Sequence, residues 1–249
     1  MTRRIFHFFW TAAATFSNPV DSFSNMAPSI KLTYFDIEAA AEPVRLALVL
    51  SGTEFEDERL NFANWPAIKA TTPYGQVPLM SVDGAPVRTQ SEAMLRWVGS
   101  TLSTTLYPAD KLFDIEEALG VVGDMSKSFE PCLYVNMRPE RFGHAEGFSK
   151  TEEGQNVVKA LRRKWLDEEL AKYLKFLTDM IDKNGGVFLA CAEPTIADCK
   201  AIPFLRSLTR GHLDHIPTDC LEVNPKIVEY VKRFCALEPI VGRYKDGMF

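Results

Sequence analysis

Lys31-Leu32-Thr33-Tyr34-Phe35-Asp36 is the stretch that decides the fold of this chain. Its side chains alternate as in a strand, which predicts Leu32 and Tyr34 on one face and Thr33 on the other. The strand ends at Asp36, and Glu42-Pro43 then opens an apolar helix, because proline suits the first helical turn. A tyrosine hydroxyl at the end of a strand, just before a helix N-terminus, is placed to meet a ligand anion.

A second stretch, Thr72-Pro73-Tyr74-Gly75-Gln76-Val77-Pro78-Leu79-Met80, leads into another run with strand character, from Val77 to Val82. The bond before Pro78 is an X-Pro bond, for which the cis form is accessible. Asp83-Gly84 predicts a tight turn that returns through residues 86–88, because Asp-Gly tolerates the positive φ of a hairpin. The sequence therefore predicts a hairpin here.

The elements around these stretches follow a recognisable order. Thr89 and Glu92 have the spacing of a capping box that opens a helix, although Ser91 could be the cap itself. The order β-α-β, loop, β-hairpin, α is that of a thioredoxin-like domain. Its other expected elements are a helix at 42–51, a strand at 55–60 and a short helical turn or loop at 64–69.

After Tyr107-Pro108 the strand signals vanish, and apolar residues recur at helical spacings of three and four. Thr195 and Asp198 have the spacing of a capping box, which is a structural role. We expect helices at 111–136, 151–183, 195–208 and 225–234. The fold class predicted is a thioredoxin-like α/β domain over 29–108 followed by an all-helical domain over 109–249, with an extension over 1–28.

The extension differs from the rest of the chain. Thr2-Arg3-Arg4 is basic, residues 5–14 form a short apolar run, and residues 17–28 are rich in Ser, Asn and Pro. This pattern resembles a weak signal or transit peptide. An unstructured extension, or a true start at Met26, is the alternative explanation.

Composition excludes several functional classes. A net charge of −5 over 249 residues argues against a nucleic-acid or acidic-membrane partner. No apolar run approaches the about 20 residues that a membrane-spanning helix needs. The five cysteines show no CxxC spacing, which predicts reduced thiols. His212 and His215 are the one close histidine pair, and we expect no metal site because no carboxylate or cysteine pattern supports them.

Several short motifs follow one another along the chain. They are Leu32-Thr33-Tyr34-Phe35, Ala41-Glu42-Pro43-Val44-Arg45, Asn64-Trp65-Pro66, Gly75-Gln76-Val77-Pro78 and Gln90-Ser91. In this order and at this spacing they resemble those of cytosolic glutathione S-transferases of the tyrosine type, sigma-like in particular. The resemblance covers 30–108 and 109–249 and implies a cytoplasmic homodimer, joined through the helices at 87–107 and 111–137, with glutathione as substrate or cofactor.

The resemblance implies that Tyr34 is catalytic. The glutathione thiol has a cysteine-like pKa of about 8.5, so only about 3% is thiolate at neutral pH. Lowering that pKa by about two units needs about 2.7 kcal/mol. A hydroxyl donating to sulfur in a dry site, helped by a helix N-terminus, can supply that amount. No cysteine precedes Cys132 and no serine lies between Ser29 and Ser51, so cysteine-type and serine-type mechanisms lack their residue here.

The remaining glutathione contacts are also implied by the resemblance. The Val77 backbone would pair with the cysteinyl unit as an added strand. The γ-glutamyl carboxylate would meet the helix N-terminus at Gln90 and Ser91. Trp65 and Lys69 would bind the glycyl carboxylate. The full set expected to contact glutathione is Tyr34, Trp65, Lys69, Gly75, Gln76, Val77, Pro78, Gln90 and Ser91.

The chain departs from the sigma-like pattern in one important place. Ala40 stands where an arginine is expected beside the thiolate, so that support is missing or supplied elsewhere. We interpret Arg45, on the following helix, as structural. Cys191 replaces a glycine expected upstream of Thr195, and Asp124 is, by position, the candidate acidic residue lent to the site of a partner subunit.

The electrophile pocket is expected between the two domains, lined by Ile37, the 111–137 helix and the tail around Phe249. The helix offers an apolar face there, made of Phe129, Leu133, Tyr134 and Met137, although a place in the core explains these residues equally well. Three functions remain open. They are conjugation of glutathione to hydrophobic electrophiles, a glutathione-dependent isomerase of the prostaglandin-synthase type, and a glutathione-binding or structural protein with little turnover.

Overall fold

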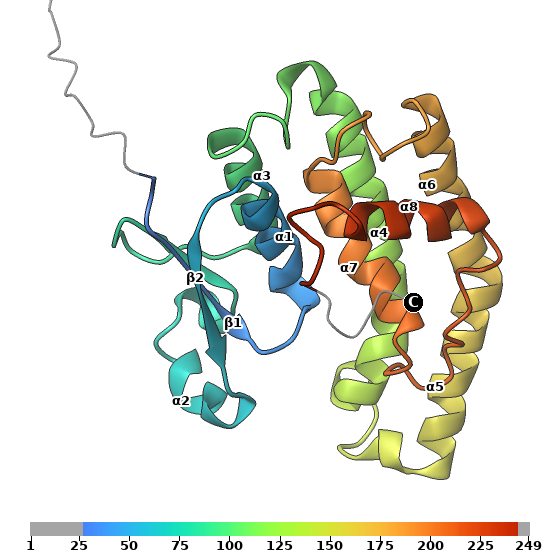
Figure 1. The fold of residues 1–249 in the computed structure, drawn as a ribbon. Helices are drawn as coiled ribbons and strands as arrows, with labels where there is room; N and C mark the ends of the chain where they lie inside the picture. The colour runs from blue at the N-terminus through green and yellow to red at the C-terminus, as the bar shows by residue number, and fades with distance from the viewer. Residues whose placement is uncertain (1–26, 244–249) are drawn as a thin grey trace, which may run out of the picture.

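The computed structural model describes residues 27–243, so the predictions made for 1–26 and for Phe249 lie outside its described residues. A sheet with its short helices lies on one side of the molecule, and long helices form the other side (Figure 1). Between residues 27 and 243, no helix is both long enough and apolar enough to cross a membrane. All five cysteines are free.

Three strands form one sheet in the order β2-β1-β3. The central β1 (Ile30–Phe35) is parallel to β2 (Phe55–Leu60) and antiparallel to β3 (Leu79–Val82). Leu32 and Tyr34 are buried on one face of β1, whereas the Thr33 hydroxyl on the other face donates to Glu58 at 2.6 Å. The predicted alternation is confirmed.

The hairpin prediction is right for the turn and wrong for the returning strand. Asp83 and Gly84 have φ values of 52° and 71°, as a tight hairpin turn requires. Beyond the turn, only Arg88 pairs with β3, through an isolated bridge to Met80. Pro86 lies in this segment and has no N–H to give to a ladder, which accounts for the loss of the strand.

The capping box predicted for Thr89 and Glu92 is also wrong. Helix α3 (Ser91–Thr101) begins after Gln90, whose φ is 73° and whose side chain forms no cap hydrogen bond. The Glu92 carboxylate pairs instead with Lys200 and with Arg96, the latter at 3.4 Å. The N-cap residue Gln90 therefore leaves the first N–H groups of α3 without a side-chain cap.

Helices α1 (Glu42–Leu50) and α3 lie between the sheet and the long helices (Figure 1). A short helix, α2 (Trp65–Lys69), lies at the outer side of the sheet. The long helices are α4 (Leu112–Met137), α5 (Glu152–Trp165), α6 (Ala171–Lys183), α7 (Ile196–Thr209) and α8 (Pro225–Cys235). The predicted class, thioredoxin-like then all-helical, is confirmed.

The long helix predicted over 151–183 is interrupted. A π-helical turn over 166–170 joins α5 to α6. The helix starts where its cap predicts, since the Thr151 hydroxyl accepts from the Gly154 N–H at 3.0 Å. One wide turn changes which side chains face the core without ending the helix.

Helix α7 packs against both halves of the molecule. Its predicted capping box is confirmed, with Thr195 and Asp198 bonded reciprocally. Asp198 is fully buried and also accepts from the Leu189 N–H at 3.0 Å and the Tyr230 hydroxyl at 2.8 Å. A Cβ on Gly99 of α3 would lie 2.7 Å from the Ile196 side chain, so only glycine allows this approach.

Candidate functional site

Tyr34 lies near the end of β1, and its side chain is 8% exposed. Its hydroxyl oxygen accepts a hydrogen bond from the Ala40 N–H at 3.4 Å. Burial, the main cause, raises the pKa of Tyr34, while the Ala40 N–H and the nearby Arg45 charge act in the opposite direction. The phenol therefore stays protonated at neutral pH and keeps its own hydrogen available for an anion.

Arg45 links the strand, the loop and the helix around this tyrosine. Its fully buried guanidinium donates to the Ile37 carbonyl at 2.8 Å and to Asp57 of β2 at 3.0 Å. The guanidinium carbon also lies 5.7 Å from the centre of the Tyr34 ring. These contacts agree with the structural role predicted for Arg45.

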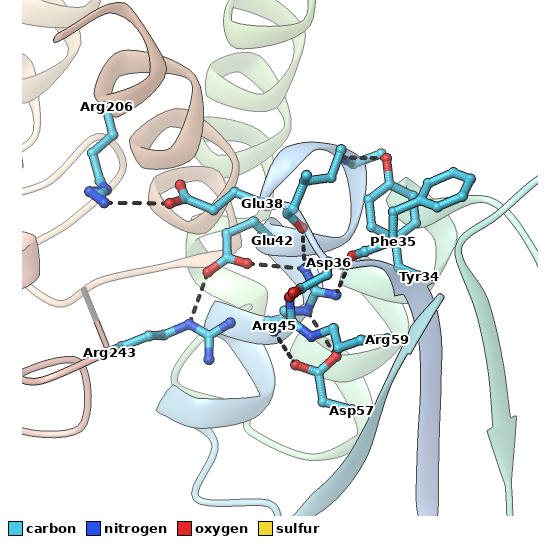
Figure 2. Close-up of polar contacts among 12 residues, drawn as sticks. Tyr34, Phe35, Asp36, Glu38, Glu42, Arg45, Asp57, Arg59, Arg206 and Arg243 are labelled. Carbon is cyan, nitrogen blue, oxygen red and sulfur yellow. Dashed lines mark hydrogen bonds and ion pairs between the residues drawn. The ribbon is translucent and has the colours of Figure 1, made fainter. Parts of the chain in front are cut away.

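The loop between β1 and α1 carries two acidic side chains that reach the helical half (Figure 2). Glu38 accepts from Arg206 of α7 at 3.4 Å and from Arg210, the residue that follows α7. Glu42, at the start of α1, pairs with Arg45 at 3.3 Å and with Arg243 at 2.9 Å. The position of this loop is therefore tied to the helical half by charge.

Trp65 and Lys69 mark the two ends of the short α2. The Trp65 ring meets the edge of Phe35, the neighbour of Tyr34, with 5.4 Å between ring centroids. The Lys69 side chain is exposed and runs along Gly75, where an added Cβ would lie 3.4 Å from its Cε. The absence of a side chain at Gly75 thus leaves room for Lys69.

The segment before β3 has the backbone of a strand edge. The Val77–Pro78 peptide bond is cis. Since Thr33 pairs with Leu79, Pro78 stands opposite Tyr34 just beyond the last paired residues. Among the described residues, no backbone hydrogen bond uses the Val77 N–H or C=O. A peptide-like ligand could use both groups by adding a strand here.

The N-terminus of α3 has the open geometry that an anion needs. Gln90 has a left-handed backbone, which is unusual for a residue with a side chain and is often found at functional positions. Ser91, the first helical residue, is half-buried. Uncapped N–H groups at a helix start suit a carboxylate.

Most of the predicted site residues thus lie on β1 or on the segments around it, but not all of them do. Asp124 lies on α4, where its side chain is exposed and, among the described residues, is bonded to none of these groups. For Phe129 the sequence left pocket and core open, and the structure places it in the core, where it packs against Trp165 with 4.7 Å between ring centroids. Tyr134 lies nearer the site, since it adds to the upward shift of the Tyr34 pKa.

The charged contacts of Glu38 were missed by the sequence analysis. Arg206 lies in the apolar run Pro203-Phe204-Leu205, which is a signal that the arginine is buried and needs an acidic partner. Nothing in the sequence identifies that partner, which stands 168 positions earlier in the chain. In residues 27–243, no group of three or more His, Cys, Asp and Glu side chains could hold a metal ion.

Comparison with known proteins gives two matching family models. The model described as glutathione S-transferase, N-terminal domain matches residues 30–100, and that described as glutathione S-transferase, C-terminal domain matches 145–243. Glutathione S-transferase 1 of Ascaris suum is 32% identical over 171 residues, covering 69% of this chain and 76% of that protein. Glutathione S-transferase 3 of Caenorhabditis elegans is 28% identical, covering 81% of this chain and 92% of that protein.

Solved structures agree with these matches. Prostaglandin synthase D of Nilaparvata lugens has a TM-score of 0.70 and 26% identity, covering 88% of this chain and 97% of that one. A monomeric glutathione S-transferase of Necator americanus has a TM-score of 0.66 and 24% identity, covering 88% of this chain and 96% of that one. At that identity, the second likeness concerns the fold alone.

Proposed function

The chain belongs to the glutathione S-transferase family, and from this premise we propose that Tyr34 stabilises the thiolate of bound glutathione for attack on hydrophobic electrophiles. The observation that supports Tyr34 most is the state of its hydroxyl, which is buried, protonated and held by the Ala40 N–H. A phenol that accepts one hydrogen bond becomes a better donor in the next, because neighbouring hydrogen bonds polarise one another.

In the proposed reaction, the Tyr34 O–H donates to the glutathione sulfur, and the thiol proton leaves to solvent. The sulfur lone pair then forms the S–C bond while the bond from carbon to the leaving group breaks and takes its electron pair. The N-terminal turn before α1 adds a favourable dipole near the sulfur. The protein supplies no other group to the chemical step in this proposal.

The rest of the tripeptide would be bound by the groups around this centre. We assign the cysteinyl backbone to Val77, beside Gly75, Gln76 and Pro78, because the edge there is open. We assign the γ-glutamyl carboxylate to the uncapped start of α3 at Gln90 and Ser91. The glycyl carboxylate is assigned to Trp65 and Lys69 at the two ends of α2.

The direct test is steady-state conjugation by the full chain and by Tyr34→Phe. We expect kcat/KM to fall about 100-fold, the equivalent of about two pKa units of lost thiolate stabilisation. Tyr173→Phe is the matched control, because Tyr173 is also 8% exposed and lies on α6, away from the site. Equal activity of Tyr34→Phe and wild type would refute the role of Tyr34.

A glutathione-dependent isomerase is the second candidate, supported by the likeness to prostaglandin synthase D. The two activities share the thiolate and differ in the second substrate. Assaying one preparation with an aryl halide and with a prostaglandin-type endoperoxide separates them. Ala40, in place of a supporting arginine, favours the third alternative, binding with little turnover.

The assembly, location and domain limits belong to the same proposal. Two large apolar side chains are highly exposed, Tyr74 in the turn before β3 at 80% and Phe113 on α4 at 82%, which supports a homodimer. Asp124 would then be lent to the partner's site. Sedimentation of wild type and Phe113→Glu tests the dimer.

Five free thiols support a cytoplasmic location. We keep the domain limits at 28/29 and 108/109.

A further inference from the structure

Residues 36–41 connect the strand that carries Tyr34 to α1, and they contain no basic residue of their own. Basic side chains reach this loop from α7. Arg206 and Arg210 both donate to the Glu38 carboxylate, across 168 and 172 positions of sequence. The Arg206 side chain is fully buried and that of Glu38 is 24% exposed, so water screens this contact only in part.

The residue after Glu38 has a strained backbone. Ala39 has a φ of 35°, in the left-handed region that side chains disfavour. Such a conformation persists only where the surroundings hold it on both sides. On one side, Glu38 is bonded to α7 and the Ile37 carbonyl to Arg45 at 2.8 Å. On the other side, the Ala40 N–H is bonded to the Tyr34 hydroxyl.

Ala39 therefore lies between Glu38, which is bonded to the helical half, and the Ala40 N–H, which donates to the proposed catalytic hydroxyl of Tyr34. Release of the Glu38 side chain would let Ala39 relax to a negative φ. That rotation would turn the following N–H away from Tyr34. The hydroxyl would lose the bond that polarises it towards a ligand anion.

We propose that Glu38 is a positioning residue for Tyr34, through which Arg206 of α7 and Arg210, directly after α7, keep the Ala40 N–H on the phenol oxygen. The inference rests on the proposed role of Tyr34 in thiolate stabilisation. It assigns the helical half a part in activating glutathione, through a loop of the other half.

Other charged groups face the same place and define the controls. Arg45 lies over the Tyr34 ring, and Glu42 bonds both Arg45 and Arg243. A change to any of these three charged groups would alter the electrostatic potential at Tyr34 directly. Arg210 is the more informative partner to change, because its side chain is 36% exposed and the helix can lose it without opening the core.

The experiment is a pH titration of the bound glutathione thiolate, followed by its ultraviolet absorbance, on the full chain. Glu38→Gln and Arg210→Gln should each raise the pKa of the bound thiol by about half a unit or more, with the glutathione Kd within about twofold of wild type. The double variant should shift no further than Glu38→Gln alone, because both changes cut one linkage.

Two further variants separate positioning from general damage. Glu56→Gln removes an exposed carboxylate that pairs with Lys31 on β1, and should leave the thiol pKa unchanged. Adding Ala39→Gly to Glu38→Gln should recover part of the shift, because glycine adopts a positive φ without strain. A purely structural ion pair would not give this recovery.

The outcomes are distinct. If wild type forms the thiolate and neither Glu38→Gln nor Arg210→Gln changes the pKa of the bound thiol, the inference is wrong and the proposed function stands. Independent, additive shifts, or no recovery with Ala39→Gly, also overturn it. A wild-type protein that binds glutathione without forming thiolate refutes the proposed function itself.

Discussion

The two ends of α7 each meet a carboxylate, and the two contacts differ in kind. At its N-terminus, Asp198 is fully buried and accepts only from neutral N–H and O–H groups of Leu189, Thr195 and Tyr230. At its C-terminal end, Glu38 accepts from two guanidinium groups. The first contact closes the helix on its own half, and the second reaches a loop of the other half.

This difference separates stability from activity along one helix. A buried carboxylate satisfied by neutral donors fixes local geometry, because removing it leaves those donors unbonded. The more exposed part of the second contact, between Glu38 and Arg210, adds little stability, yet it can set the position of a backbone. The predictions below test this separation, from the largest expected effect to the smallest.

Asp198→Ala should cost about 3 kcal/mol or more of unfolding free energy, because it orphans buried N–H and O–H donors. Chemical denaturation of the full chain measures this loss. The thiol pKa of glutathione bound to the remaining folded protein should not change. A change in that pKa equal to the one expected for Glu38→Gln would break the separation between the two ends.

Tyr34→Phe should show the opposite behaviour. Turnover should fall about 100-fold, while unfolding free energy changes by less than about 1 kcal/mol, since the one hydrogen bond that the hydroxyl accepts from protein is 3.4 Å long. Denaturation and kinetics on one preparation give both values. A large loss of stability with little loss of turnover would assign Tyr34 to the core.

At the C-terminal end of α7, the two arginines should differ in their effect on stability. Arg206→Gln should cost about 2–3 kcal/mol, because the side chain is fully buried and leaves Glu38 half-paired. Arg210→Gln should cost about 0.5 kcal/mol, because its side chain is 36% exposed. Equal losses of unfolding free energy for the two variants would show that burial does not determine how much each arginine contributes to stability.

The smallest effect on stability is expected for Glu58, which contacts the opposite face of β1. The Thr33 hydroxyl, first, and then Lys31 lower the pKa of Glu58, so this carboxylate adds stability above its unfolded pKa of about 4.3. That stability is lost as pH falls through the lower folded pKa. With side chains about 40% exposed, the contribution should be about 0.5 kcal/mol. Denaturation across this pH range should show a weaker pH dependence in Thr33→Val than in wild type, with the part due to Lys31 remaining.

Much of the fold could be predicted from sequence, because periodicity and caps are local. The central strand at Ile30–Phe35 and the box of Thr195 and Asp198 were read directly from spacing. The spacing of Thr89 and Glu92 predicts a capping box that does not form, because Glu92 pairs with Lys200, which is distant in sequence. The wide turn at 166–170 falls in one five-residue step between the buried Trp165 and Leu170, and a single such step does not predict an interruption of the helix.

The candidate site divides in the same way. Tyr34 and the Val77–Pro78 edge lie in short motifs, which is why sequence alone places them. Glu38 gains its role only from arginines about 170 positions away. A single sequence carries no signal for that pairing, because the fold alone brings the end of α7 to this loop.

The most direct test of the account is the ultraviolet pH titration of glutathione bound to wild type and to Tyr34→Phe. The account predicts a bound thiol pKa about two units below the free value of about 8.5 in wild type, and a return to near that value in Tyr34→Phe. The same pKa in both proteins, with glutathione bound to both, would contradict it.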